Sequence, residues 1–257
     1  MCATCGCGDE SAVITLAGDG HHDHQHHHPH DHVHTETISL EQKVLAKNDL
    51  IAEQNRKWLA GRNVLALNIT SSPGAGKTTL LEKTIGELTP RRHICVIEGD
   101  QETLLDAERI RAAGAKAVQV NTGAGCHLDA EMVRRALETL GPAPGSLLFI
   151  ENVGNLVCPA LFDLGEYSKL VVISVTEGAD KPLKYPHMFA AAGLIVLNKI
   201  DLLPYVDFDL ESFRNFVRSV NPTAEILPIS AKTGDGIAAW YDWIDVRANQ
   251  HHVTTIR

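Results

Sequence analysis

The stretch Ser71-Ser72-Pro73-Gly74-Ala75-Gly76-Lys77-Thr78-Thr79 decides the fold of this chain. It follows an apolar run over residues 64–70 and precedes an amphipathic run over residues 78–88, which is the strand–loop–helix context of a phosphate-binding loop. Small residues let successive backbone N–H groups surround phosphates, and the N-terminus of the following helix adds its positive end. We expect Lys77 to reach the β- and γ-phosphates and Thr78 to hold Mg²⁺ through its hydroxyl group.

One position of this loop departs from the usual pattern. Ser71 stands where such loops normally begin with glycine, so the general pattern is met only from Gly76 onward. A glycine-rich turn that binds no ligand is the alternative, but Gly-Lys-Thr-Thr in this context favours phosphate binding. The residues predicted to contact the nucleotide are Gly74, Ala75, Gly76, Lys77, Thr78 and Thr79.

Apolar and amphipathic runs alternate along the rest of the chain. Several apolar runs are nearly continuous in Val, Ile and Leu, which is typical of strands covered on both faces. The expected strands cover residues 64–70, 93–98, 117–120, 147–152, 170–175, 194–198 and 226–229, and the expected helices cover residues 78–88, 103–113, 128–140, 209–220 and 235–246. This alternation predicts an α/β fold of the P-loop NTPase type, with a doubly wound, mostly parallel sheet and helices on both faces.

Two short motifs further along the chain predict the base of the nucleotide. In Asn198-Lys199-Ile200-Asp201, the Asp201 carboxylate can accept hydrogen bonds from N1–H and the N2 amino group of guanine, and adenine offers no such pair of donors. Lys199 can lay its alkyl stem along the purine. Ser230-Ala231-Lys232 resembles the loop that closes the guanine pocket in GTPases. Each motif is weak alone, but their order behind a phosphate loop predicts a GTPase domain over residues 62–257.

The resemblance to GTPases extends to two acidic positions. Asp100 follows the second expected strand, where this class of GTPase keeps an aspartate linked to Mg²⁺. Glu151-Asn152-Val153-Gly154-Asn155 takes the place of the Asp-x-x-Gly switch, which senses the γ-phosphate through residues such as Gly154, but glutamate replaces aspartate and no glutamine follows the glycine. We therefore expect slow turnover with Lys77, Asp100 and Glu151 as catalytic residues, Asp100 or Glu151 polarising the water. A Glu151 that only caps a strand end is the alternative.

Residues 1–38 have a different composition from the rest of the chain. They contain three cysteines near the N-terminus and a tract, residues 21–34, in which nine of fourteen residues are histidine. Such a segment cannot bury enough apolar surface to offset its ordering entropy, so it is predicted to be disordered.

Cys2, Cys5 and Cys7 predict a metal site in this tail. With Met1 removed, the free α-amine would join three thiolates, and four nitrogen and sulfur donors on a short strand can adopt the square-planar geometry that suits Ni²⁺. Zn²⁺ would accept the same donors tetrahedrally, so the sequence does not choose the metal. A redox-sensitive tail that binds no metal is the alternative.

The histidine tract predicts a low-affinity metal store, because imidazoles at many spacings chelate nickel, zinc, copper and cobalt alike. A purification tag is the alternative, but the interleaved Asp23, Gln25 and Asp31 do not look engineered. The predicted storage ligands are His21, His22, His24, His26, His27, His28, His30, His32 and His34.

A helix over residues 39–61 is expected to connect the tail to the GTPase domain. Ser39 and Gln42 form a capping-box pattern, and Ile38 lies at the position of a hydrophobic staple. The apolar positions that follow form an imperfect stripe, so we expect this helix to pack on the surface of the domain.

Three residues inside the expected GTPase domain form a second candidate metal site. Cys126-His127 follows the third expected strand, and Cys158 follows the switch motif. Inert packing of buried cysteines and an ordinary helix-start histidine are the alternative on spacing alone. The position of Cys158 beside the switch favours metal binding, whereas Cys95, inside an expected strand, is assigned to packing.

Composition restricts the partners and the compartment. The 257 residues carry a formal net charge of −9, which argues against a nucleic-acid partner. No run approaches the roughly 20 apolar residues that a membrane span needs, and the N-terminus shows neither a basic patch nor an apolar run. We therefore expect a cytosolic protein whose six cysteines are reduced.

The chain resembles the HypB family. The similarity is carried by the N-terminal Cys-x-x-Cys-Gly-Cys and by four runs: VIEGDQ at 96–101, VNTGAGCHLD at 120–129, FIENVGNLVCP at 149–159 and VTEGADKPLKYPHMFAA at 175–191. It extends nearly continuously over residues 64–246. The resemblance implies a GTPase that supplies nickel during [NiFe]-hydrogenase maturation.

Several further properties are implied by this resemblance alone. They are a homodimer promoted by GTP, a HypA-type zinc-binding nickel chaperone and a hydrogenase large-subunit precursor as partners, and Ni²⁺ or Zn²⁺ bound by Cys126, His127 and Cys158 at or near the dimer interface. GTP is then expected to reposition residues 151–155 and so move Cys158 relative to Cys126 and His127. Lys181 is a candidate for a contact across the dimer.

Two other functions remain open at this point. One is nickel delivery to a different enzyme such as urease, against which the three N-terminal cysteines and the internal Cys–His group argue. The other is a nickel store with a vestigial GTPase, against which the intact Lys77, Thr78, Asn198 and Asp201 argue.

Overall fold

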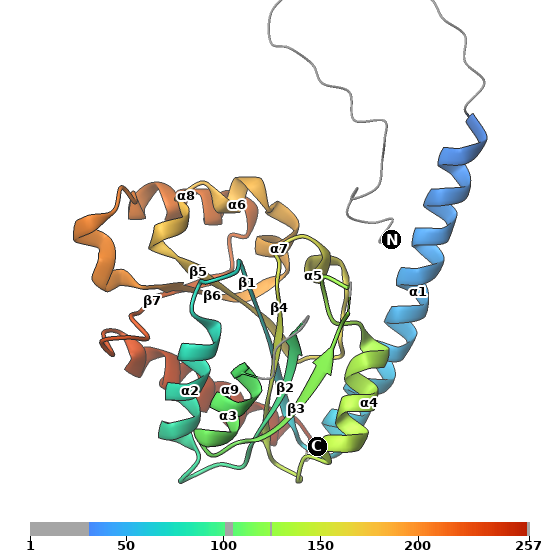
Figure 1. Cartoon of the computed structure of the whole chain (residues 1–257), viewed down its shortest axis with the longest axis horizontal. Coiled ribbons are helices and arrows are strands. Elements are labelled where there is room, and N and C mark those ends of the chain that lie inside the picture. The colour runs from blue at the N-terminus through green and yellow to red at the C-terminus, as the bar shows by residue number, and fades with distance from the viewer. Residues whose placement is uncertain (1–30, 101–104, 124, 256–257) are drawn as a thin grey trace, which may run out of the picture.

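In the computed structural model, which describes residues 31–100, 105–123 and 125–255, seven strands form one sheet in the order β3-β2-β4-β1-β5-β6-β7 (Figure 1). Every pairing between neighbouring strands of this sheet is parallel. The strands are β1 (Leu65–Ser71), β2 (Ile94–Asp100), β3 (Lys116–Asn121), β4 (Leu147–Gly154), β5 (Ser168–Ser174), β6 (Ala192–Asn198) and β7 (Glu225–Pro228). All seven expected strands are therefore confirmed.

Helices cover both faces of the sheet, as predicted (Figure 1). On one face, α2 (Lys77–Leu88), α3 (Leu105–Ala112) and α9 (Ile237–Thr255) bury apolar side chains against β1, β2, β4, β5 and β6. On the other face, α1 (Asp31–Gly61) and α4 (Ala130–Leu140) cover the β2–β4–β1 side, and α7 (Pro186–Ala191) and α8 (Leu210–Val220) cover β5 and β6. All residues of β1 are buried, which explains its apolar sequence.

Two helix ends differ from the sequence-based expectation. The predicted start of α1 at Ser39 is wrong, because the helix begins at Asp31. No glycine or proline occurs between residues 31 and 60, and an aspartate in the first turn is favourable. At the other end of the chain, α9 extends past residue 246 because its buried positions continue to Ala248.

Three short helices were not predicted: α5 (Cys158–Leu161), α6 (Lys181–Lys184) and α7. Each has a proline at its first or second position and spans six residues or fewer, which is too short for a periodic apolar pattern to emerge. Two 3₁₀ turns, η2 (Val175–Glu177) and η3 (Ile200–Tyr205), complete the described elements. None of the helices in the described ranges is long and apolar enough to cross a membrane.

The sheet order determines where a ligand can bind. From β1 the chain builds β2, β3 and β4 on one side of this strand, and it then crosses to the other side, where it builds β5, β6 and β7. In open parallel sheets a crevice forms beyond the carboxyl ends of the strands at such a reversal. The glycine-rich stretch 71–79 spans the end of β1, the loop after it and the first residues of α2, so the fold places the predicted phosphate-binding residues at this crevice.

Candidate functional site

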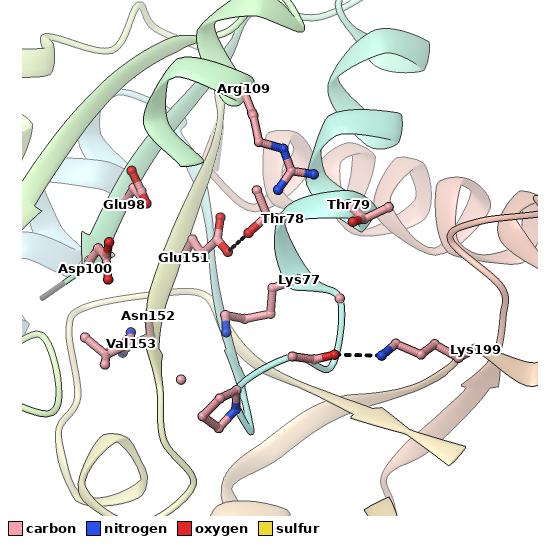
Figure 2. Close-up of a pocket in the computed structure, with 15 residues that line it drawn as sticks. Lys77, Thr78, Thr79, Glu98, Asp100, Arg109, Glu151, Asn152, Val153 and Lys199 are labelled. Carbon is pink, nitrogen blue, oxygen red and sulfur yellow. Dashed lines mark hydrogen bonds between the residues drawn. The ribbon is translucent and has the colours of Figure 1, made fainter. Parts of the chain in front are cut away.

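The carboxyl ends of β1, β2 and β4 open into a cleft of about 560 Å³ (Figure 2). Its walls combine the glycine-rich loop with acidic residues from the neighbouring strands. The lining residues are Pro73, Gly74, Gly76, Lys77, Thr78, Thr79, Glu98, Gly99, Asp100, Arg109, Glu151, Asn152, Val153, Gly154 and Lys199.

Glycine is required at position 76, at the N-terminus of α2. Gly76 has a φ of 97°, and a Cβ atom there would lie 2.6 Å from Asn198 Nδ2. The next residue, Lys77, donates a hydrogen bond from Nζ to Ser71 Oγ at 2.7 Å. Ser71, the departure from the usual loop pattern, therefore orients the lysine that is predicted to meet the phosphates.

A hydroxyl group and three carboxylates lie on adjacent elements of the cleft. Thr78 Oγ1 donates to Glu151 Oε1 at 2.7 Å, as the dashed line in Figure 2 shows. Glu98 is the register partner of Glu151 in the β2–β4 ladder, and Asp100 ends β2. Such an oxygen-rich donor set suits a hard cation like Mg²⁺. The structure thus brings Thr78, Asp100 and Glu151 to one place, as predicted.

Three charged or polar residues of this cleft, Glu98, Arg109 and Asn152, were not predicted as site residues. Glu98 is buried in β2 two residues before Asp100, and a second carboxylate so close to the predicted one was a usable signal. Arg109 reaches the cleft from α3, where its guanidinium group donates to both carboxylate oxygens of Glu82 at 2.9 and 2.7 Å. Asn152 is a buried residue of the switch segment 151–155. Nothing in the local sequence distinguishes Arg109 from other helix-surface arginines.

The predicted base-binding motifs converge beside the glycine-rich loop. Asn198 Nδ2 donates to the Ala75 carbonyl at 2.9 Å, and Asn198 Oδ1 accepts from Ala231 N at 2.9 Å. Lys199 Nζ donates to the Gly74 carbonyl at 2.7 Å (Figure 2). One asparagine therefore connects the phosphate loop to the loop of residues 230–232.

The carboxylate predicted to recognise guanine is held in this arrangement. Asp201 Oδ1 accepts a hydrogen bond from Ser230 Oγ at 2.6 Å. The carbonyl of Lys232 accepts from Lys83 Nζ at 2.9 Å, which attaches the same loop to α2. The motifs around Asn198 and Ser230, far apart in sequence, thus lie side by side, and Lys199 connects them to the lining of the cleft.

Cys126, His127 and Cys158 form a compact cluster, and their potential ligand atoms all lie within 4.8 Å of one another. Cys126 Sγ is 3.1 Å from Cys158 Sγ and 3.6 Å from His127 Nδ1. The imidazole packs on Phe162 with ring centroids 4.0 Å apart. Burial lowers the pKa of His127, which favours the neutral form that binds metals. Two sulfur donors and one nitrogen donor suit Ni²⁺ or Zn²⁺.

Cys95, which was assigned to packing, and the predicted metal ligands of the tail have other outcomes. Cys95 is buried in β2 as expected, and burial raises the pKa of its thiol. The tail ligands Cys2, Cys5 and Cys7 and the histidines at positions 21–30 lie outside the described residues, and the side chains of His32 and His34 on α1 are likewise not described. The tail metal site and the histidine store therefore stay predictions.

Lys181, proposed for a contact across a dimer, has partners within its own chain. Its Nζ lies 3.6 Å from Glu177 Oε2 and 5.3 Å from the centre of the Tyr185 ring. These contacts hold the lysine on the surface of α6. A contact across a dimer would require the Lys181 ammonium group to be shared between these partners and the second copy of the chain, or to be released from Glu177 and Tyr185.

Comparison with known proteins shows which family the chain matches. Residues 65–228 match the family described as "CobW/HypB/UreG, nucleotide-binding domain". The chain is 58% identical over 211 residues to hydrogenase maturation factor HypB of Rhizobium leguminosarum, covering 82% of this chain and 71% of the relative. It is 56% identical over 210 residues to HypB of Escherichia coli K12, covering 82% of this chain and 72% of the relative.

Two solved structures are similar to the fold. HypB from Archaeoglobus fulgidus superposes with a TM-score of 0.74 and 41% identity, covering 79% of this chain and 99% of that chain. HypB from Helicobacter pylori in complex with nickel gives the same TM-score with 35% identity, covering 79% of this chain and 96% of that chain.

Proposed function

The chain belongs to the HypB family within the CobW/HypB/UreG group of nucleotide-binding proteins, and we propose that it is a GTP-hydrolysing nickel metallochaperone that delivers nickel, or regulates its insertion, during [NiFe]-hydrogenase maturation. One observation carries this proposal. The segment from Glu151 to Cys158 begins in the nucleotide cleft and ends in the Cys–His cluster. A chain with this segment can respond to nucleotide at one end and to metal at the other.

The proposed substrate of the cleft is GTP. Backbone N–H groups of the glycine-rich loop would surround the phosphates, and Lys77 would neutralise charge on the β- and γ-phosphates. Mg²⁺, held by Thr78 and Asp100, would stabilise the charge that develops on the phosphate oxygens. The Thr78 hydroxyl donates a hydrogen bond to Glu151, so the lone pairs of the Thr78 oxygen can still ligate the cation.

Hydrolysis by this site is proposed to be slow. Glu151, or Asp100 across the cleft, would polarise the attacking water. Asn155 follows Gly154 where Ras-like GTPases keep a glutamine that orients this water. An asparagine side chain is one methylene shorter than glutamine, and Asn155 donates a hydrogen bond to the Cys126 carbonyl, so its amide is not directed at a water in the cleft. The family and the fold support nucleotide hydrolysis in general, and the low rate is the finer part of the proposal.

Nickel is the proposed cargo of the cluster. The thiolates of Cys126 and Cys158 are soft ligands and the His127 imidazole is a borderline one, a set that binds Ni²⁺ or Zn²⁺. Nickel in the Helicobacter pylori HypB structure supports the choice of metal. The tail cysteines at positions 2, 5 and 7 are proposed as a separate, tighter nickel site, and the histidine tract as a store.

Partners and compartment follow from the family as further proposals. GTP would promote a homodimer, and a HypA-type zinc-binding chaperone and the hydrogenase large-subunit precursor would exchange nickel with it. The compartment is proposed to be the cytosol. The −9 charge gives no reason to add a nucleic-acid partner.

The deciding experiment measures Ni²⁺ affinity of the full chain with GDP and with a non-hydrolysable GTP analogue. Three proteins are compared: the wild type, Cys126→Ala, and a variant with Cys2, Cys5 and Cys7 replaced by serine. Support for the proposal is a nickel site that survives the tail substitutions, responds to nucleotide and disappears in Cys126→Ala. If nickel binding disappears with the tail cysteines and nucleotide never changes it, the two functions are separate and the proposal is wrong.

Two controls separate the competing functions. A steady-state GTPase assay distinguishes the metallochaperone from a nickel store, because a vestigial site would show no turnover. Transfer of nickel from the loaded protein to a purified hydrogenase large-subunit precursor, compared with transfer to apo-urease, distinguishes the target enzyme. Preferential activation of urease would contradict the hydrogenase assignment.

A further inference from the structure

Two asparagines connect the end of β4 with the loop that carries Cys126 and His127. Asn155 Nδ2 donates a hydrogen bond to the Cys126 carbonyl at 3.2 Å. Asn152 Oδ1 accepts a hydrogen bond from Leu128 N at 3.1 Å. The main chain is thus attached to the switch segment on both sides of His127.

Asn155 also contacts the loop that leads to the third ligand. Its Oδ1 accepts a hydrogen bond from Val157 N at 2.9 Å, directly before Cys158 begins α5. A single amide group therefore uses its donor on the Cys126 loop and its acceptor on the Cys158 turn. The two sulfur atoms that these segments carry are 3.1 Å apart.

The other side of Asn155 adjoins the nucleotide cleft. Gly154 lines the cleft, pairs with Ser71 of the phosphate loop, and is so close to Pro73 that a Cβ atom on it would lie 3.2 Å from three Pro73 atoms. Asn155 is joined to Gly154 by one planar peptide group. A shift of Gly154 toward a γ-phosphate would therefore be passed directly to the Asn155 side chain.

We propose that Asn155 is the positioning residue that couples the nucleotide state to metal affinity, by setting the position of the Cys126 main chain relative to Cys158. The inference deepens the proposed function and rests on it. The donor bond from Asn155 Nδ2 to the Cys126 carbonyl carries the coupling, whereas the acceptor bond to Val157 N holds the local turn. A coupling of this kind requires the donor bond to differ between the GDP and GTP states.

Asn155→Asp, made in the full chain, tests whether the donor bond to the Cys126 carbonyl and the acceptor bond from Val157 N have these separate roles. Aspartate keeps an acceptor for Val157 N but cannot donate to the Cys126 carbonyl. The background carries serine at positions 2, 5 and 7, so that the thiolate-to-nickel charge-transfer absorption reports the Cys126 and Cys158 site. Ni²⁺ is titrated in the presence of GDP and of a non-hydrolysable GTP analogue. We expect the ratio of the two nickel dissociation constants to fall from at least about 5-fold, the lower end of typical couplings, to below about 2-fold, with the absorption band retained.

Asn121→Asp is the matched control. Asn121 ends β3 at the start of the same loop, and its Oδ1 accepts from Gly123 N at 2.7 Å within that loop. This substitution adds the same negative charge and keeps the same kind of acceptor. We expect the nucleotide-dependent ratio of nickel affinities to stay at the value of the parent protein.

The outcomes separate the inference from the proposed function. If the parent shows no thiolate band with nickel, the proposed metal site is wrong and the inference fails with it. If the parent shows the band and a nucleotide-dependent ratio that Asn155→Asp leaves intact, only the inference is overturned. Equal weakening of nickel binding with both nucleotides would show a structural role for Asn155 and would overturn the inference as well.

Discussion

The nucleotide cleft and the Cys–His cluster meet on one segment but are held in place by different forces. In the cleft, the key side chains lie on buried parallel strands or in the first turn of α2, so the backbone hydrogen bonds of the sheet and of the helix fix their positions. In the cluster, Cys126 and Cys158 come from two separate connections, and polar side chains attach these connections to each other. The cluster therefore depends on individual polar contacts far more than the cleft does.

A buried ion pair adds polar contacts to the segment that carries Cys158. Lys169 Nζ donates to the carbonyls of Pro159 and Phe162 at 2.6 and 3.3 Å and lies 3.9 Å from Glu166 Oε1. Glu166 in turn accepts from Asn68 Nδ2 at 2.9 Å. Burial lowers the pKa of Lys169 and raises the pKa of Glu166, which disfavours both charged forms. The opposite charge of the partner counteracts this effect at each residue. The helix that presents Cys158 is anchored by charge.

Lys169→Met has the largest expected effect and tests whether this ion pair stabilises the protein. The substitution keeps much of the side-chain volume but leaves the Glu166 carboxylate without its counter-charge and the carbonyls of Pro159 and Phe162 without their donor. We expect a loss of about 3–5 kcal/mol in the free energy of unfolding, measured by urea denaturation of the metal-free protein. The double variant Glu166→Gln with Lys169→Met removes the lone charge and should recover part of the loss. A change below 1 kcal/mol in the single variant would show that α5 is held by packing alone.

Lys77→Ala tests the cleft through the rate of GTP hydrolysis and not through stability. The ammonium group of Lys77 is expected to meet charge that develops on the phosphates, and removal of one such group costs about 10²–10³ in rate. We expect kcat/KM for GTP to fall by about this factor while nickel affinity without nucleotide is retained. Lys57→Ala is the control, because Lys57 is an exposed lysine of α1 that pairs with Glu53 and does not line the cleft. A loss of basal nickel affinity in Lys77→Ala would show that cleft and cluster are not separable.

The difference between the two sites also explains what could be predicted from the sequence. The phosphate loop is a local signal, since Gly76, Lys77 and Thr78 are consecutive and their geometry follows from one strand–loop–helix unit. The strands were predictable because buried parallel strands are continuously apolar. The convergence of Asn198 with Ala75 and Ala231 followed from motif order, and the structure confirms that these loops meet.

What the sequence left out depends on tertiary contacts. The placement of Glu98 opposite Glu151 follows from β2 pairing with β4, which are not consecutive in sequence. The approach of Cys126 to Cys158 was implied by family resemblance, and no local pattern places two loops side by side. The short helices from α5 to α7 escaped prediction because prolines and brevity hide their periodicity. The roles of the site residues stay predictions for the experiments above.

Asp201→Asn tests the predicted recognition of guanine. The carboxylate is expected to accept two hydrogen bonds from guanine, and an amide nitrogen in its place would face a donor. We expect GTP affinity to fall by roughly 10- to 100-fold, corresponding to about 1–3 kcal/mol for an unsatisfied polar contact. Xanthosine triphosphate, whose base carries an oxygen at position 2, should gain affinity instead. Asp235→Asn, which alters a carboxylate bonded to Thr233 nearby, is the control and should leave the GTP-to-XTP preference unchanged.

Asp163→Asn has the smallest expected effect and tests the edge of the region that supports the cluster. Asp163 Oδ2 lies 2.5 Å from Arg56 Nη2, and Oδ1 accepts from Gly165 N at 2.8 Å. Burial raises the pKa of Asp163, but the bonds from Arg56 and Gly165 outweigh it and hold the pKa below the usual 3.8.

A carboxyl group whose pKa is lowered by folding stabilises the protein above its unfolded pKa, and this contribution is lost as the pH falls through the folded pKa. Both side chains are about two-fifths exposed, so solvent screening limits the contribution to less than about 1 kcal/mol. Urea unfolding should therefore show Asp163→Asn slightly less stable than the wild type at pH 7, with the difference shrinking toward pH 3. A difference that grew on acidification would contradict an ion pair between α1 and the segment after α5, and would leave the Lys169–Glu166 pair as the charged anchor of that segment.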